Sequence, residues 1–276
     1  MSDIEVPRLE LTDGTTIPKL GLGVYKVADD EAERVVRIAL DEGYRHVDTA
    51  TLYGNEAGVG RAIRASGLDR DDVYLTTKVW NTAHGYDETL RAFDESLARL
   101  GTDHVDLYLI HWPAPARDRY VETYRALETI RAEGRARSIG VSNFSIAHLE
   151  RLLGETDVVP VVDQVEAHPW LPQRELRAFG DAHGIVTEAW SPLARGRILD
   201  DEVLLGIAER HGVSTAQVVI RWHLQQGMVV IPKSATASRI RSNLDVFGFE
   251  LDDADLAAIA RLESGRRTGS HPDDVE

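Results

Sequence analysis

Asp48 and Tyr53 are the first residues in the chain whose types and spacing suggest chemistry. A helical pattern ends at Gly43, a short strand-like stretch then ends at Asp48, and Tyr53 lies in the loop before the next helical pattern. A free phenol has a pKa of ~10 and is a weak acid at neutral pH, but a nearby cation favours its ionised form. The pair therefore predicts acid–base chemistry, provided that other segments bring matching groups to the same place.

Matching groups do occur at the ends of other apolar stretches. Because the working residues of α/β barrels lie at the carboxyl ends of the strands, these positions are the ones to compare. Any one of these residues could be a surface charge or core packing, but the set in register favours a functional site. In chain order, the residues at or just after the predicted strand ends are Asp48, Lys78, His111, Ser142 and Asn143, Gln164, Trp190 and Ser191, and Lys233 and Ser234.

The elements that would position these groups form a regular alternation. Eight short apolar stretches alternate with helical patterns without a change in composition, which predicts an α/β fold, a single (β/α)8 TIM barrel domain over residues 1–276. We expect a β-hairpin within residues 1–18, and a loop-like tail over residues 264–276. The first and eighth strands are expected at 20–24 and 228–231. An open doubly wound sheet is the alternative arrangement.

Local signals predict several helix ends. We expect Asp29 or Asp30 to cap the first helix, and Ser214 to open a later helix through a capping box with Gln217. Pro172 suits the first turn of the helix that precedes Gly184.

Composition excludes several functions. The formal net charge is −15, and no basic stripe is present that could displace counterions from nucleic acid. The chain has no cysteine, so disulfides and thiolate metal sites are excluded. No apolar stretch approaches the ~20 residues that span a bilayer, and Met1–Glu10 lacks the apolar core of a signal peptide. We expect a cytoplasmic monomer with a small-molecule substrate, no nucleic-acid or membrane partner, and no metal.

The strand-end residues stand in longer motifs that extend over nearly the whole chain. The motifs are Gly21-Leu22-Gly23, Asp48-Thr49-Ala50 with Tyr53-Gly54-Asn55-Glu56, Thr77-Lys78-Val79-Trp80, His111-Trp112-Pro113, Gly140-Val141-Ser142-Asn143-Phe144, Gln164 with Glu166-Ala167-His168-Pro169, Ser191-Pro192-Leu193, and Ile231-Pro232-Lys233-Ser234 with Arg239 and Asn243. Together they resemble the aldo-keto reductase family, including the prokaryotic branch of 2,5-diketogluconate and methylglyoxal reductases. The resemblance implies NADPH-dependent reduction of aldehydes and ketones to alcohols.

The expected catalytic set is Asp48, Tyr53, Lys78 and His111. Carbonyl reduction needs a hydride on carbon and a proton on oxygen. We expect Tyr53 to donate the proton as general acid and Lys78 to lower its pKa. Asp48 would hold Lys78 charged and oriented, and His111 would direct the substrate oxygen toward Tyr53.

A second set is expected to bind NADPH. Trp190 offers a flat face for the nicotinamide, and Ser142, Asn143 and Gln164 can hydrogen-bond its carboxamide. Lys233, Ser234 and Arg239 precede or open a helix, where phosphate binds well. Their charge favours NADPH over NADH. The resemblance adds Ser191, Leu193 and Asn243 to this set, while Ser242 replaces the Glu that many relatives have near the adenine.

Substrate contacts are expected from loops. The candidates are Tyr25, Trp80, His111 and Trp112, together with the tail after Ser264. Tyr25 differs from the Trp of some relatives, and the sequence does not identify the carbonyl that is reduced.

Three other interpretations agree less well with these residues. Gly54, Gly58 and Gly60, with Tyr74 and Lys78, match short-chain dehydrogenase signatures, but the Tyr–Lys pair lies in a strand pattern here and not on a helix. A metal-dependent barrel hydrolase lacks the His-x-His or carboxylate cluster that it needs. A non-catalytic NADPH-binding regulatory protein would share the fold, and the intact catalytic set disfavours it.

Overall fold

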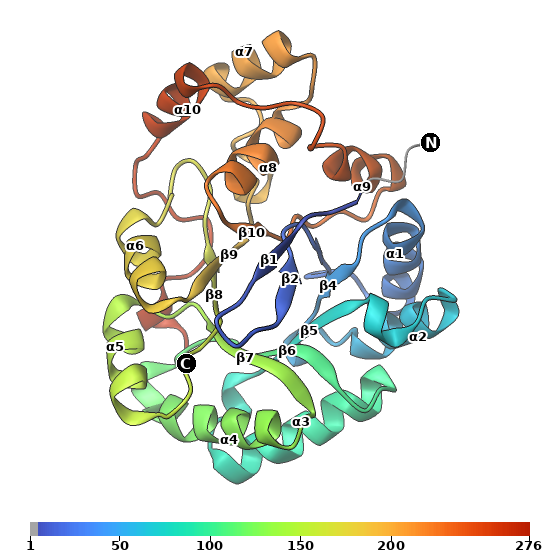
Figure 1. The fold of residues 1–276 in the computed structure, drawn as a ribbon, viewed down its shortest axis with the longest axis vertical. Coiled ribbons are helices and arrows are strands. Elements are labelled where there is room, and N and C mark those ends of the chain that lie inside the picture. The colour runs from blue at the N-terminus through green and yellow to red at the C-terminus, as the bar shows by residue number, and fades with distance from the viewer. Residues whose placement is uncertain (1–4) are drawn as a thin grey trace.

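The computed structural model describes residues 5–276, in which eight parallel strands form a barrel surrounded by helices (Figure 1). The first four residues of the expected N-terminal segment lie outside this range. The strands follow one another around the sheet in chain order. They are β3 (Leu22–Gly23), β4 (His46–Asp48), β5 (Tyr74–Val79), β6 (Val105–Ile110), β7 (Ala136–Ser142), β8 (Val162–Glu166), β9 (Val186–Trp190) and β10 (Val229–Val230).

Single parallel bridges close the barrel between its first and last strands. Leu20 pairs with Val230, and Gly23 pairs with Lys233. The expected (β/α)8 barrel is confirmed and the open sheet is excluded. The first and eighth strands are shorter than the expected 20–24 and 228–231, because the closure between them consists of isolated bridges and not of a continuous ladder.

Helices follow the strands and cover the outside of the barrel (Figure 1). Their apolar faces pack on the strands, of which β5 and β6 are buried along their whole length. The helices are α1 (Asp29–Glu42), α2 (Glu56–Ala65), α3 (Tyr86–Leu100), α4 (Tyr120–Ala132), α5 (Ile146–Glu155), α6 (Arg174–His183), α7 (Glu202–His211), α8 (Thr215–Gln225), α9 (Ala237–Leu244) and α10 (Asp253–Ala260).

Two of the expected helix starts are wrong. Helix α1 is capped by Ala28, without a side-chain hydrogen bond. Asp29 instead accepts hydrogen bonds from the Gly58 amide at 2.6 Å and from Arg61 at 2.9 Å, so it joins α1 to α2. Pro172 precedes α6, which begins at Arg174 after a left-handed Gln173.

The capping box at Ser214 is confirmed, since its hydroxyl accepts from the Gln217 amide at 3.3 Å and the Gln217 side chain accepts from the Ser214 amide at 2.9 Å.

The glycines after Tyr53 serve helix packing. A Cβ at Gly58 would overlap the carbonyl oxygen of Asp29, and a Cβ at Gly60 would overlap that of Leu100. Helix α2 can therefore approach α1 and α3 closely only with glycine at these positions. This accounts for the glycine spacing without a phosphate-binding loop.

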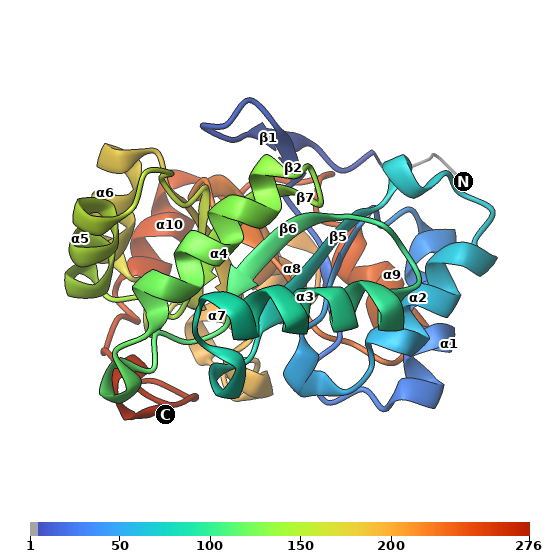
Figure 2. The same cartoon turned by 90° about the horizontal axis from the view of Figure 1, so that it is seen from below.

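The two ends of the barrel are closed by different segments. The hairpin of β1 (Arg8–Glu10) and β2 (Thr16–Pro18) covers one end, and the C-terminal tail lies at the other (Figure 2). Ile17 of the hairpin packs inside the barrel with Tyr74, Leu107 and Val229. The interior is therefore apolar near the hairpin, and the tail end holds the buried polar side chains described next.

Candidate active site

The predicted site residues come together at the tail end of the barrel. A cavity of about 290 Å³ opens there, and a groove of about 740 Å³ adjoins it and shares Tyr25, Ser191, Arg195 and Lys233. The cavity is lined by the predicted residues Tyr25, Asp48, Tyr53, Trp80, His111, Trp112, Ser142, Asn143, Gln164, Trp190, Ser191 and Lys233. The groove adds Leu193, Ser234, Arg239 and Asn243.

Lys78 is the one predicted residue that lines neither space. It is fully buried beneath the cavity floor. Its ammonium group donates to both carboxylate oxygens of Asp48, at 2.7 and 2.8 Å, and to the carbonyl of Thr49 at 2.9 Å. These bonds use the donors of the ammonium, which lies 5.2 Å from the centre of the Tyr53 ring. Asp48 thus holds Lys78 as expected, but Lys78 makes no hydrogen bond to the Tyr53 hydroxyl.

Tyr53 is held protonated by its surroundings. Loss of solvent around the hydroxyl raises the Tyr53 pKa well above its usual value, and the negative charge of Asp48 raises it further. This direction is opposite to the one expected from the sequence. Burial is the larger cause of this reversal and the charge of Asp48 the second, because Lys78 is paired with Asp48 at direct contact and does not offset them. Tyr53 keeps its proton, as a donor must, throughout the neutral range.

His111 lines the same cavity as Tyr53, and its imidazole is neutral. Burial lowers the His111 pKa well below its usual value, and the charge of Lys78 acts in the same direction. Its ring meets those of Tyr53 and Trp80 edge-on, at centroid distances of 5.5 and 5.2 Å. A neutral imidazole carries one N–H, so His111 can donate one hydrogen bond without adding charge to the cavity.

The residues expected at the nicotinamide are already joined by hydrogen bonds. The Trp190 indole donates to the Asn143 side chain at 2.9 Å, and the Asn143 amide donates to Ser142 Oγ at 3.0 Å and to the His111 carbonyl at 2.9 Å. Asn143 adopts φ 63°, a left-handed conformation that asparagine tolerates better than most residues. The indole is thereby fixed in orientation, with part of its surface exposed to the cavity.

The adjoining groove carries free positive charge. Among residues 5–276, none of Arg195, Lys233 and Arg239 has a carboxylate partner, whereas Arg241 of the same helix α9 pairs with Glu42. Arg239 lies in the first turn of α9, whose N-terminus has no side-chain cap. Unpaired cations at an open helix N-terminus fit a phosphate-bearing ligand.

Sequence reasoning missed three sets of residues at the site. Glu188 and His46 are buried below Asp48, and the signal for Glu188 was a carboxylate inside an otherwise apolar strand. Ser270 and Val275 of the tail line the cavity, as the expectation for the tail implied, but the contacting residues could not be specified. Arg195 was also missed, since it lies in a loop without periodicity.

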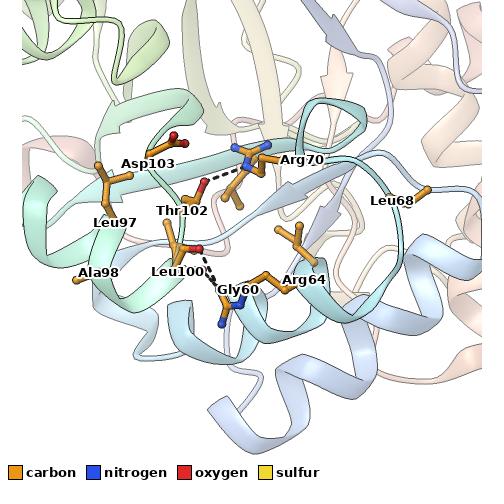
Figure 3. A pocket seen from close by; sticks show the side chains of 12 residues that line it. Gly60, Arg64, Leu68, Arg70, Leu97, Ala98, Leu100, Thr102 and Asp103 are labelled. Carbon is orange, nitrogen blue, oxygen red and sulfur yellow. Dashed lines mark hydrogen bonds between the residues drawn. The ribbon is translucent and has the colours of Figure 1, made fainter.

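A hollow outside the barrel has no comparable set of groups. It lies between α2 and α3 (Figure 3), and its polar side chains are already bonded, Arg64 to the Leu100 carbonyl and Arg70 to Thr102. No cluster of metal-binding side chains occurs among the described residues. In the same range, no helix is long and apolar enough to cross a membrane.

Comparison with known proteins adds a family to this geometry. The model of the aldo/keto reductase family matches residues 19–264. The chain is 54% identical to an aldo-keto reductase of Mycolicibacterium smegmatis, with 96% of this chain and 97% of the relative covered. It is 49% identical to the glyoxal reductase of Bacillus subtilis, with 97% and 96% covered. It is 46% identical to the methylglyoxal reductase DkgA of Escherichia coli, with 96% of both chains covered.

A solved structure shares the fold closely. A mutant of Gox0644 in complex with NADPH has a TM-score of 0.94 to this chain at 50% identity, with 98% of both chains covered.

Proposed function

The chain belongs to the aldo/keto reductase family, and from that premise we propose how its residues reduce a carbonyl compound with NADPH. The observation that carries the proposal is the meeting of Tyr53, His111 and the Lys78–Asp48 pair at one cavity beside a cationic groove. The intact set also speaks against a non-catalytic role.

Tyr53 donates the proton. The carbonyl oxygen lies between the Tyr53 hydroxyl and the neutral His111 imidazole, which donates a hydrogen bond and fixes its position. Because the raised pKa keeps the phenol protonated, the proton moves only as negative charge develops on the substrate oxygen. Lys78 and Asp48 then supply the fixed dipole beneath the resulting phenolate.

The cofactor fits the residues present. When bound, NADPH supplies the hydride. The exposed face of Trp190 supports the nicotinamide, and the polar groups of Asn143, Ser142 and Gln164 orient it. Lys233, Ser234 and Arg239 bind phosphate at the start of α9, and the residues Ser191, Leu193 and Asn243 complete the walls of the groove. The unpaired cations give this site its preference for a phosphorylated cofactor.

The substrate is a small aldehyde or dicarbonyl. The cavity is small, and Tyr25, Trp80 and Trp112 line it with aromatic surface beside Trp190. Relatives are named glyoxal and methylglyoxal reductase, which agrees with this size. We also propose that the chain acts as a single-domain monomer in the cytoplasm, and light scattering on the purified protein tests the monomer.

The test is the carbonyl-dependent loss of NADPH absorbance with a panel of aldehydes, dicarbonyls and keto-sugars. We expect Tyr53→Phe to lower kcat by ~10²–10⁴-fold, the usual contribution of a positioned acid, with little change in NADPH affinity. Tyr86→Phe is the matched control, because Tyr86 is exposed on α3 and its hydroxyl contacts Thr129. Full activity in Tyr53→Phe would contradict the mechanism.

A further inference from the structure

A buried polar layer lies directly beneath the catalytic residues. The side-chain nitrogen of Gln164 donates to Asp48 Oδ2 at 2.8 Å and to Glu188 Oε2, also at 2.8 Å. One amide group therefore joins two carboxylates, which must lie within a few ångströms of each other. Gln164 and Glu188 stand side by side in register on β8 and β9, so the arrangement is part of the sheet.

The orientation of Gln164 follows from this contact. Both hydrogens of its amide nitrogen are used below the cavity, so only its carbonyl oxygen is left for a ligand. A ligand group that meets Gln164 must therefore be a hydrogen-bond donor. Glu188 is one of the two acceptors that enforce this orientation.

The layer holds more carboxylates than cations. Lys78 is the one ammonium, and it is bonded to Asp48. His46 lies 3.6 Å from the second oxygen of Glu188, but burial lowers the His46 pKa to about 3, so it is neutral. The charge of Glu188 also acts on two phenols, Tyr53 and Tyr74. Both stay protonated, because their pKa values are raised well above the usual range.

Two buried carboxylates near one cation cannot both ionise at low cost. Burial, and after it the charge of Asp48, raise the Glu188 pKa to about 8, although the Gln164 hydrogen bond and Lys78 act in the opposite direction. Glu188 is thus a neutral acid in the neutral range, and it gains a charge in mildly alkaline solution.

We propose that Glu188 is a positioning residue for the reaction: it orients Gln164 beneath the cofactor site, and its protonation state sets the charge beside Asp48, Lys78 and Tyr53. This inference rests on the proposed function. When Glu188 ionises, its negative charge makes Tyr53 a weaker acid, because it favours the protonated phenol. The rate of the chemical step therefore falls as Glu188 loses its proton.

The experiment is a pH profile of single-turnover NADPH oxidation in wild type and Glu188→Gln, each with saturating carbonyl substrate. The variant removes the titrating group and keeps its size. For one group with a pKa of about 8, the wild-type rate should fall by about tenfold between about pH 7 and about pH 9. In Glu188→Gln, the ratio of the rates at these two pH values should stay near unity. Single turnover is needed, since slow product release would hide the chemical step.

Asp163→Asn is the matched control. Asp163, on the neighbouring strand β8, is also a buried carboxylate with a raised pKa. It contacts the Phe144 amide and not the polar layer. Its variant should keep the wild-type fall in rate. An unchanged fall in Glu188→Gln, or its loss in Asp163→Asn, would overturn the proposal.

A second measurement does not depend on turnover. A carboxyl group whose folded pKa is raised contributes stability that is present below its unfolded pKa and is lost as pH rises through the folded value. The Tm of wild type should therefore fall relative to that of Glu188→Gln between about pH 5 and about pH 9. A constant difference in Tm between the two proteins across this window would refute the ionisation of a buried Glu188. If no carbonyl were reduced at any pH, the proposed function would fail while this measurement still decided the state of Glu188.

Discussion

At the residue scale, the site is governed by which hydrogen bonds are already made. Lys78 is bonded to Asp48 and Thr49 and makes no hydrogen bond to Tyr53. Asp48 in turn is shared between Lys78 and Gln164. The proposed catalytic groups are therefore one network, and burial followed by the charge of Asp48 decides the direction of the Tyr53 pKa.

The unpaired cations at α9 lead to a prediction on cofactor choice. Arg239→Ala should raise the Kd for NADPH by about tenfold or more, because a charge-assisted hydrogen bond to phosphate is lost, and should leave the Kd for NADH nearly unchanged. Titration of tryptophan fluorescence with each cofactor measures both. Arg241→Ala is the control on the same helix, since Arg241 is paired with Glu42. Equal weakening of both cofactors would contradict a phosphate contact.

At the element scale, a buried carboxylate holds the middle of the C-terminal tail, whose first residues, Ser264 and Gly265, donate to the Trp170 carbonyl. Glu166 accepts hydrogen bonds from the Thr268 amide and hydroxyl, both at 2.6 Å, and from the Gly269 amide at 3.1 Å. Burial acts to raise the Glu166 pKa, but the hydrogen bonds from His168, Thr268 and Gly269 outweigh it and hold the pKa at about 2. Glu166 is thus ionised, and it fixes the segment that carries Ser270 and Val275 to the cavity wall.

We predict that releasing the tail impairs substrate binding more than chemistry. Glu166→Ala should raise KM for the carbonyl several-fold with a smaller change in kcat, because the cavity loses one wall. Steady-state kinetics at saturating NADPH separate the two. Glu263→Ala, which removes an exposed pair with Arg174 at the start of the tail, is the control. A fall in kcat alone would argue against this role of the tail.

At the scale of the whole molecule, buried neutral histidines make the fold sensitive to acid. Burial lowers the pKa of His84 to about 4, with the charges of Arg117 and Arg119 acting in the same direction. As the pH falls, the His84 imidazole therefore gains a proton in the unfolded chain before it does so in the folded chain. Its contribution to stability is therefore present above its unfolded pKa of about 6.5 and is lost as pH falls through about 4.

The wild-type protein should accordingly lose stability between about pH 6.5 and about pH 4. His84→Gln should remove the uptake of about one proton on unfolding. The free energy of unfolding should then fall by roughly 3 kcal/mol less across this window than in wild type. Urea unfolding at several pH values measures the slope. His183→Gln is the control, because His183 is exposed at the end of α6. An equal slope in wild type and His84→Gln would exclude His84 as the source.

The sequence alone was sufficient for the barrel and for most of the site. The signals used were local: strand periodicity, glycine at helix ends and the register of functional groups at strand ends. The folded structure agrees with each of them. The start of α1 was misplaced because Asp29 accepts hydrogen bonds from Gly58 and Arg61 of another helix. The start of α6 was misplaced because Gln173 adopts a left-handed conformation and the helix begins only at Arg174. Local propensity cannot foresee a partner that is distant in sequence.

Tertiary structure alone decided the electrostatics of the site. The sequence named Lys78 and Tyr53 and suggested that the first would lower the pKa of the second. The direction is reversed, because the barrel removes solvent from the phenol and the charge of Asp48, which is paired with Lys78, raises the pKa further. Glu188 became significant only when β8 and β9 brought it to the same amide as Asp48. Residue types are written in the chain, but burial and the distances between charges exist only after the strands have closed into a barrel.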